Sequence, residues 1–186
     1  MKHFLLVSCL LWATTSQAQA PTAGDARPQN HPAAGTPADA MSPGVQALDA
    51  KNGFRGYALG EPITNYPGLK RRSADMYVAR DEPLKLGDVR LFMLLFGAEG
   101  GRLTSINMVT MGKANATKLL AALRSEYGEG TPDDRGRVRW RGTKVGMMYQ
   151  YTVSHSDGGM SQDITGSVTM YSLEFAQAAK KALGEL

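Results

Sequence analysis

Four arginines at every second position are the residues of this chain whose types and spacing most clearly suggest chemistry. They are Arg135, Arg137, Arg139 and Arg141, with Lys144 close behind. Residues two apart in a β-strand project to the same side, so a strand here would carry a cationic ridge. The guanidinium group matches phosphate and carboxylate, which makes this arginine ridge a candidate site for an anionic partner. The alternative is a charged edge strand that discourages association with other sheets.

Residue types that support catalysis or metal binding are sparse elsewhere. His155 is the one histidine beyond residue 50, and Cys9 is the only cysteine. A single histidine without cysteines does not form the common zinc sites. The pairs Asp81–Glu82 and Asp133–Asp134 fall in predicted turns, where adjacent side chains point apart. We therefore expect no cofactor and no metal, and a non-enzymatic protein. The alternative is a small hydrolase whose site is assembled from residues far apart in sequence.

Residues 1–20 have the pattern of an export signal. A short basic start precedes the apolar run from Phe4 to Ala13, and Ala18-Gln19-Ala20 supplies the small residues of a cleavage site. The stretch from Leu6 to Cys9 resembles a lipobox, but it leaves too short an apolar core, so lipidation is not expected. We expect a soluble mature protein, periplasmic or secreted, with no transmembrane segment and no disulfide.

The remaining chain divides into a linker and one domain. Residues 21–50 are rich in proline, alanine and glycine and have no periodic apolar face, which predicts a disordered linker. Residues 51–186 are long enough to bury a hydrophobic core and are expected to form a single domain. The net charge of +4 is small, so a nucleic-acid partner is not expected.

The stretch from Val89 to Met111 is expected to organise this domain as a β-hairpin. Its first strand contains the continuous apolar run Leu91 to Phe96, which suggests burial on both faces. The glycine-rich segment Gly97 to Arg102 predicts a turn, because glycine accepts positive φ angles. A phosphate-binding loop would open into a helix, whereas Leu103 to Val109 continues as a strand.

The later segments predict the rest of an α+β fold. Asn115 to Tyr127 has helical periodicity with Asn115 as N-cap, Arg137–Arg141 and Val145–Val153 alternate as a second hairpin, and Leu173–Leu183 is an amphipathic helix. We predict an antiparallel sheet of about six to eight strands packed against one main helix, with a C-terminal helix. An offset of about 61 residues aligns a second helix-then-strands series with the first, which makes tandem α-then-β units a further hypothesis.

Several short motifs resemble a family of small exported bacterial proteins with no assigned activity. The motifs are Gly53-Phe54-Arg55-Gly56, Leu59-Gly60, Pro67-Gly68-Leu69, Tyr77-Val78-Ala79-Arg80, Leu84-Lys85-Leu86-Gly87, Gly101-Arg102-Leu103, Tyr127-Gly128 and Trp140-Arg141-Gly142. They are turns and strand starts, so the resemblance implies no catalytic residue. At fold level the pattern is also similar to envelope assembly lipoproteins and to secreted β-lactamase-inhibitor modules.

The combined expectation is an exported binding or interaction module of the bacterial envelope. Its partner would be an anionic envelope component or another protein, bound through the arginine ridge. An inhibitor-like protein that binds another protein is the alternative within the same class of function.

Overall fold

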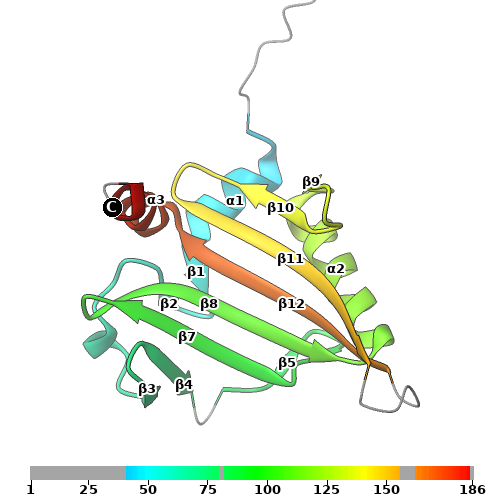
Figure 1. Cartoon of the computed structure of the whole chain (residues 1–186), viewed down its shortest axis with the longest axis horizontal. Helices are drawn as coiled ribbons and strands as arrows, with labels where there is room; N and C mark the ends of the chain where they lie inside the picture. The colour runs from blue at the N-terminus through cyan, green and yellow to red at the C-terminus, as the bar shows by residue number, and fades with distance from the viewer. Residues whose placement is uncertain (1–40, 80–81, 156–161, 185–186) are drawn as a thin grey trace, which may run out of the picture. The chain divides into compact units, whose positions relative to one another are not determined.

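The computed structural model describes residues 41–79, 82–155 and 162–184. In these ranges the chain forms three helices, one eight-stranded antiparallel sheet and two small two-stranded sheets (Figure 1), which confirms the predicted α+β fold. The predicted signal peptide and residues 21–40 of the predicted linker lie outside the described residues. None of the helices in the described ranges is long and apolar enough to span a bilayer.

The large sheet consists of two four-stranded meanders that meet at its centre. Its order is β3 (Leu69–Ser73), β4 (Met76–Ala79), β7 (Met93–Glu99), β8 (Arg102–Met111), β12 (Gln162–Ser172), β11 (Val145–His155), β10 (Val138–Arg141) and β9 (Thr131–Pro132). Every neighbouring pair is antiparallel, and the last strands of the two meanders, β8 and β12, pair with each other. Two meanders of the same order are what the hypothesis of tandem α-then-β units requires. The helices in front of them differ, because α2 precedes the second meander and only the short 3₁₀ helix η1 (Ile63–Asn65) directly precedes the first.

The hairpin of β7 and β8 lies next to this centre. Gly100 and Gly101 form its tip with φ angles of +57° and +75°, which confirms the predicted turn. The prediction that its apolar run is buried on both faces is wrong. Leu94 and Phe96 are buried, whereas Leu95 between them is half-buried and Phe92 is 56 % exposed. Helices cover only one face of the strand, so the apolar run alternates in burial.

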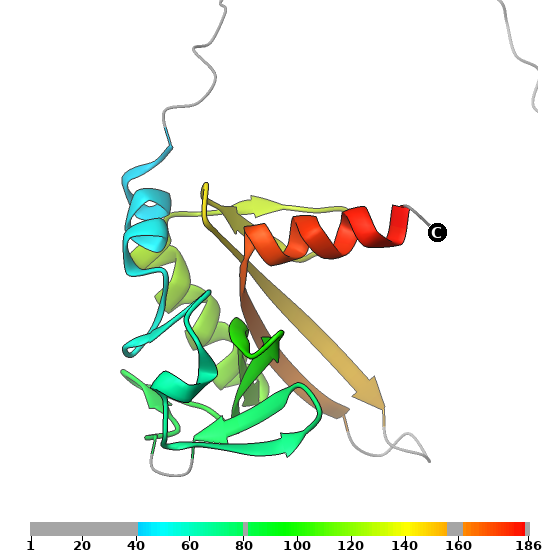
Figure 2. The ribbon, with the colours of Figure 1, turned by 90° about the vertical axis from the view of Figure 1, so that its left-hand side faces the viewer.

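The covered face carries most of the remaining elements. They are α1 (Pro43–Lys51), α2 (Lys113–Tyr127), the small sheet of β1 (Gly53–Phe54) and β2 (Tyr57–Ala58), and the small sheet of β5 (Lys85–Leu86) and β6 (Val89–Arg90). The C-terminal helix α3 (Leu173–Gly184) leaves the end of β12 and projects to the other side of the sheet (Figure 2). The core therefore lies between the sheet and the layer formed by α1 and α2.

Helix α2 packs closely on β12. Its buried stripe is Ala116, Leu119, Leu123 and Tyr127. Gly166 of β12 lets the helix approach, because a Cβ at this position would lie 2.8 Å from the Cβ of Ala116. The predicted N-cap, Asn115, is wrong: β8 continues to Met111, and Gly112, with φ of +83°, turns the chain directly into the helix. Asn115 instead donates from Nδ2 to the carbonyl of Met111 at 3.2 Å.

Helix α1 occupies residues that the sequence assigns to the end of the linker. Residues 43–50 are helical rather than disordered, because Ser42 caps the helix by accepting from the Val45 amide at 3.3 Å, and proline stands at its first position. Asn52 ends it in the left-handed conformation. Leu48 is completely buried against the core, and this burial offsets the entropy of ordering the segment.

The side chain of Asp49 fastens α1 to the turn between β10 and β11. Its Oδ2 accepts from the amide and hydroxyl of Thr143 at 2.6 and 2.7 Å, and its Oδ1 accepts from the amides of Lys144 and Val145, each at 3.0 Å. Partial burial acts to raise the pKa of Asp49, but the hydrogen bonds from Thr143, Val145 and Lys144 outweigh it and hold the pKa below its ordinary value.

Replacement of Asp49 should therefore destabilise the domain in a pH-dependent way. At pH 7 we expect Asp49→Ala to lower the free energy of unfolding by about 1 to 2 kcal/mol, since hydrogen bonds to a charged group are lost at a partly exposed site. A carboxyl group whose pKa is lowered by folding stabilises above its unfolded pKa, and this contribution is lost as pH falls through the folded pKa. Urea unfolding at pH 7, 4 and 3 should show the two proteins converging in acid, and a constant difference would contradict this assignment.

Candidate functional site

The register of the strands separates the sheet into a buried face and an uncovered one. One row of cross-strand partners runs over all eight strands, through Lys70, Val78, Leu95, Asn107, Thr169, Met148, Arg139 and Thr131. All eight side chains are half-buried or exposed. The next row contains Phe96, Ile106, Met170, Met147 and Trp140, which are all buried. We call the side that carries the first row the open face, which is turned toward the viewer in Figure 1.

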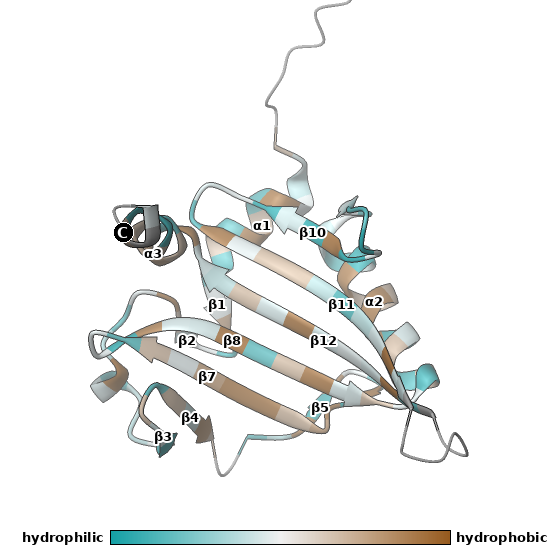
Figure 3. Cartoon of the chain, in the orientation of Figure 1, coloured by the Kyte–Doolittle hydropathy of each residue, from teal (hydrophilic) through white to brown (hydrophobic). Residues whose placement is uncertain are grey.

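The centre of the open face is uncharged. Five strands, β4, β7, β8, β12 and β11, form this centre. Tyr171 is the only ionisable residue among their open-face positions, which are every second residue of 76–78, 93–97, 105–111, 165–171 and 146–152. The first two strands contribute apolar side chains to the face, and the last three contribute mostly hydroxyl and amide groups. Along the ribbon, β7 is mostly brown, whereas β8 and β11 include teal residues (Figure 3). Thr169 donates from its hydroxyl to Oδ1 of Asn107 at 2.7 Å, which joins β12 and β8 across the face.

Basic side chains lie at both ends of this row. Lys70 of β3 is exposed, as is Arg72 two residues further along the strand, and Arg139 and Arg141 are exposed on β10. Six strand-to-strand steps separate β3 from β10, which at roughly 4.8 Å each is about 29 Å. The open face is therefore a neutral surface between two cationic edges.

A cavity of about 560 Å³ lies at the edge that carries Arg139 and Arg141. We call it the edge cavity; these arginines, Trp140, Tyr171 and the segments around Ser42 and residues 127–131 line it. Tyr171 belongs to the open face and lies across Gly146, where an added Cβ would be 2.4 Å from its ring and 2.7 Å from its hydroxyl oxygen. Since Gly146 pairs with Arg141, the hydroxyl end of Tyr171 lies on the Arg141 side of the face.

The predicted arginine ridge does not form as four parallel side chains. Strand β10 begins only at Val138, and Arg135 lies in the preceding turn. The cause is Asp133, whose Oδ1 accepts from the amides of Arg135 and Arg137, each at 3.0 Å, and folds the segment into a tight turn. Residues 135 and 137 are therefore outside the strand, where the period-two argument does not apply.

Asp133 also neutralises part of the ridge. Its Oδ2 accepts from Nε of Arg137 at 2.7 Å and forms ion pairs with Nη2 of Arg137 at 2.7 Å and with Nη2 of Arg139 at 2.9 Å. Burial acts to raise the pKa of Asp133, but hydrogen bonds from Arg137 and Arg135 and the charge of Arg137 keep that pKa low. In the described part of the chain, Arg141 makes no ion pair. Of the predicted ridge, Arg141 is therefore the residue best placed to meet an anionic partner.

Lys144 lies apart from the other basic residues, in the turn between β10 and β11. Its amide donates to Asp49, its carbonyl accepts from the amide of Leu173 at 2.9 Å, and its side chain is exposed. Sequence reasoning did not identify Tyr171 or the placement of Lys70 on the same face as Arg139. The alternation of polar residues in 165–171 indicated one polar face, but only the strand register shows which strands lie beside it.

No cluster of acidic, histidine or cysteine side chains with the grouping of a metal site occurs within residues 41–79, 82–155 and 162–184. Of the carboxylates considered from sequence, Asp133 is engaged by arginines, and Glu82 accepts from Arg55 at 3.3 Å and from the Tyr57 hydroxyl at 3.2 Å. The side chain of His155 lies outside the described residues.

Comparison of the chain with protein-family models, with curated proteins and with solved structures found no match to any of them. The resemblance to small exported bacterial proteins therefore stays a prediction, and function has to be inferred from the site itself.

The arginines should separate into structural and exposed residues when they are replaced. Arg137→Ala removes two side-chain contacts to Asp133, so we expect a clearly lower urea midpoint for the domain. Arg141→Glu changes an exposed side chain with no ion pair and should leave the free energy of unfolding within about 0.5 kcal/mol of the unmodified protein. Equal destabilisation by the two substitutions, measured by urea unfolding at pH 7, would show that Arg141 is also structural.

Proposed function

We propose that this chain is an exported, non-enzymatic binding module that holds an acidic surface of a partner protein on its open face. The observation that supports the proposal is the arrangement of charge: an uncharged centre able to form hydrogen bonds lies between basic edges, and the edge cavity opens beside Arg141. Complementary charge across an interface increases association rates and selects the partner.

The spacing of the cations favours a folded protein over a polyanionic polymer or a lipid surface. A polymer or a membrane is bound best by a continuous run of cations, whereas here a neutral surface about 29 Å wide, on the strand spacing of a sheet, separates them. A standard interface buries roughly 800 Å² on each partner, which is a patch of about this width. The edge cavity supplies a place for an anchoring carboxylate, since well-packed anchors carry most of the binding energy of an interface.

The inhibitor-like function expected as an alternative is a special case of this proposal, in which the bound partner is an enzyme. The small hydrolase has less support, because Asp133 beside the arginine ridge and Glu129, which lines the edge cavity, are both paired with arginines. Export to the periplasm or the exterior remains part of the proposal and rests on the pattern of residues 1–20.

The test first captures a partner protein by crosslinking and then measures the affinity of the purified partner for this chain. Exported proteins crosslinked to the chain would be identified by mass spectrometry, and the leading candidate would be produced pure for calorimetry. We expect Arg141→Glu to weaken its binding at least tenfold, since a like charge would face the acidic surface. We also expect the affinity to fall between 50 and 300 mM salt.

Lys118→Glu is the matched control, because Lys118 is an exposed lysine of α2 on the covered side of the sheet. It makes the same charge change and should leave the affinity unaltered. Three results would contradict the proposal: equal binding by all three proteins, recovery of no protein beyond that held by bare resin, or Arg141-dependent binding to anionic vesicles or polymers in place of a protein.

A further inference from the structure

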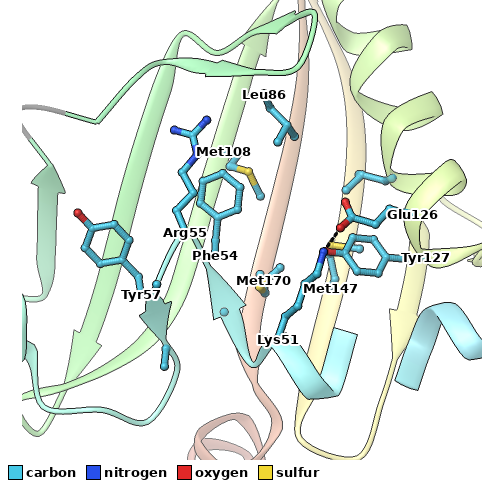
Figure 4. A pocket seen from close by; sticks show the side chains of 14 residues that line it. Lys51, Phe54, Arg55, Tyr57, Leu86, Met108, Glu126, Tyr127, Met147 and Met170 are labelled. Carbon is cyan, nitrogen blue, oxygen red and sulfur yellow. Dashed lines mark hydrogen bonds and ion pairs between the residues drawn. The ribbon is translucent and has the colours of Figure 1, made fainter. Parts of the chain in front are cut away.

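A second cavity lies on the covered side of the sheet, away from the open face. It has a volume of about 380 Å³, and we call it the inner cavity. Met108, Met147 and Met170 form its floor from three adjacent strands, β8, β11 and β12 (Figure 4). Leu123 and Tyr127 of α2 form one wall. These five side chains are at most 6 % exposed, so core residues form this end of the cavity, whereas the exposed residues Lys51, Arg55 and Glu126 line its open end.

The opposite side of the inner cavity is closed by the small sheets. Phe54 comes from β1 and Leu86 from β5. Arg55, next to Phe54, fixes this cover by donating to the carbonyls of Pro83, at 2.6 Å, and Lys85. The lining is thus mostly apolar, and methionine is the side chain that adapts most readily to ligands of different shape.

One polar group in the inner cavity lacks a partner. No residue in the described ranges forms a hydrogen bond with the Tyr127 hydroxyl, although this side chain is only 6 % exposed. In Figure 4 its ring extends from α2 toward Lys51 and Met147. Burial raises the pKa of Tyr127, so the hydroxyl keeps its proton at neutral pH and can donate. No fully buried side-chain nitrogen or oxygen in the described ranges lacks a partner, so the Tyr127 hydroxyl keeps contact with solvent and is accessible to a ligand at the entrance.

The entrance is marked by an ion pair between Lys51 of α1 and Glu126 of α2. About half of each side chain is exposed, at 51 % and 44 %. The Nζ atom of Lys51 lies 5.5 Å from the centre of the Tyr127 ring. The paired ammonium and carboxylate groups of Lys51 and Glu126 and the phenol of Tyr127 therefore lie together where the apolar cavity meets solvent. A few polar groups at one end of an apolar pocket fix the orientation of a ligand, and a head group here would share Lys51 with Glu126.

From this geometry we infer that the inner cavity binds a medium-length acyl chain, with the oxygen-bearing head accepting from Tyr127 beside Lys51. A methylene takes up about as much space as a water molecule, roughly 30 Å³, so a cavity of 380 Å³ holds a chain of about eight to twelve carbons. The methionine floor lies on the opposite side of the sheet from the open face, whereas Tyr127 lines both the inner cavity and the edge cavity. Arg141, on which the test of protein binding rests, does not line the inner cavity, so the two proposals can fail separately.

Methionine methyl groups give a test that reports position as well as binding. In the ¹³C-methyl-methionine protein, decanoate below its micelle concentration should shift the signals of Met108, Met147 and Met170. Met76 and Met111 are the internal controls, since they are 39 % and 41 % exposed and belong to the open face. Shifts confined to these two, or equal shifts of all five, would show only surface adsorption and would overturn the inference. An absence of shifts would also overturn it.

Chain length and head group provide the second measurement, by calorimetry on the unmodified protein. Affinity should rise about fourfold per added methylene and stop rising near ten to twelve carbons, when the cavity is full. A rise that continues well beyond twelve carbons would contradict a site of this size. A cationic amphiphile of equal length that binds as tightly as decanoate would contradict the role of Lys51 and Tyr127.

Tyr127→Phe removes only the hydroxyl and should weaken decanoate binding about tenfold, as expected for one hydrogen bond to a charged group. Tyr151→Phe is the control, because Tyr151 is a 40 % exposed tyrosine of β11 that does not line the cavity. Equal affinities of these two variants would contradict the assignment of Tyr127. Octanoate and methyl octanoate distinguish the sources of the chain: tighter binding of the acid indicates a free fatty acid, and equal binding indicates an ester-linked lipid chain.

Discussion

The pairing of β8 with β12 is the interaction on which the rest of the structure depends. These two strands are the last of their meanders, so their ladder is what makes one sheet out of two halves. Thr110 is completely buried there and satisfies its hydroxyl by donating to the carbonyl of Gly166 at 3.0 Å. Gly166 also admits α2 at close range. Gly166 thus takes part in the ladder that joins the two halves of the sheet, allows α2 to pack closely, and accepts the hydrogen bond of the buried Thr110 hydroxyl.

Both proposed sites follow from this central pair. The side chains of β8 and β12 alternate, so the same two strands supply Met108 and Met170 to the inner cavity and Asn107 and Thr169 to the open face. The two surfaces are separated by a single layer of backbone. Because the sheet is covered on one side by α1 and α2, its two sides have different chemistry: the covered side is apolar, and the open face combines apolar and polar side chains without charge at its centre.

Sequence reasoning reached the fold class, the turn of the central hairpin and the main helix because these depend on local patterns. Gly100 and Gly101 between apolar strands predict a turn wherever they occur, and the spacing of Leu119, Leu123 and Tyr127 predicts a helix. It failed at α1, although Ser42-Pro43 and Asn52-Gly53 are start and stop signals, because the proline-rich composition of the whole region outweighed them.

Sequence reasoning also failed at Arg135 and Arg137, since nothing in the alternation shows that Asp133 will accept from their amides. Lys70 and Arg139 are 69 residues apart, and their common face depends on the register of six strand pairs.

The edges of the large sheet limit how a partner can be recognised. At one end β9 is two residues long and contains Pro132, which has no amide hydrogen to donate, and at the other β3 has an irregular register near Arg71 and Ser73. Neither edge is suited to accept a further strand. Selectivity for a partner therefore has to come from side-chain contacts rather than from backbone hydrogen bonds to an added strand. Every second side chain of the sheet strands lies on the open face and points away from the core. These side chains can be substituted without disturbing the packing of the core. The same scaffold can therefore acquire a different partner through a few substitutions on one face.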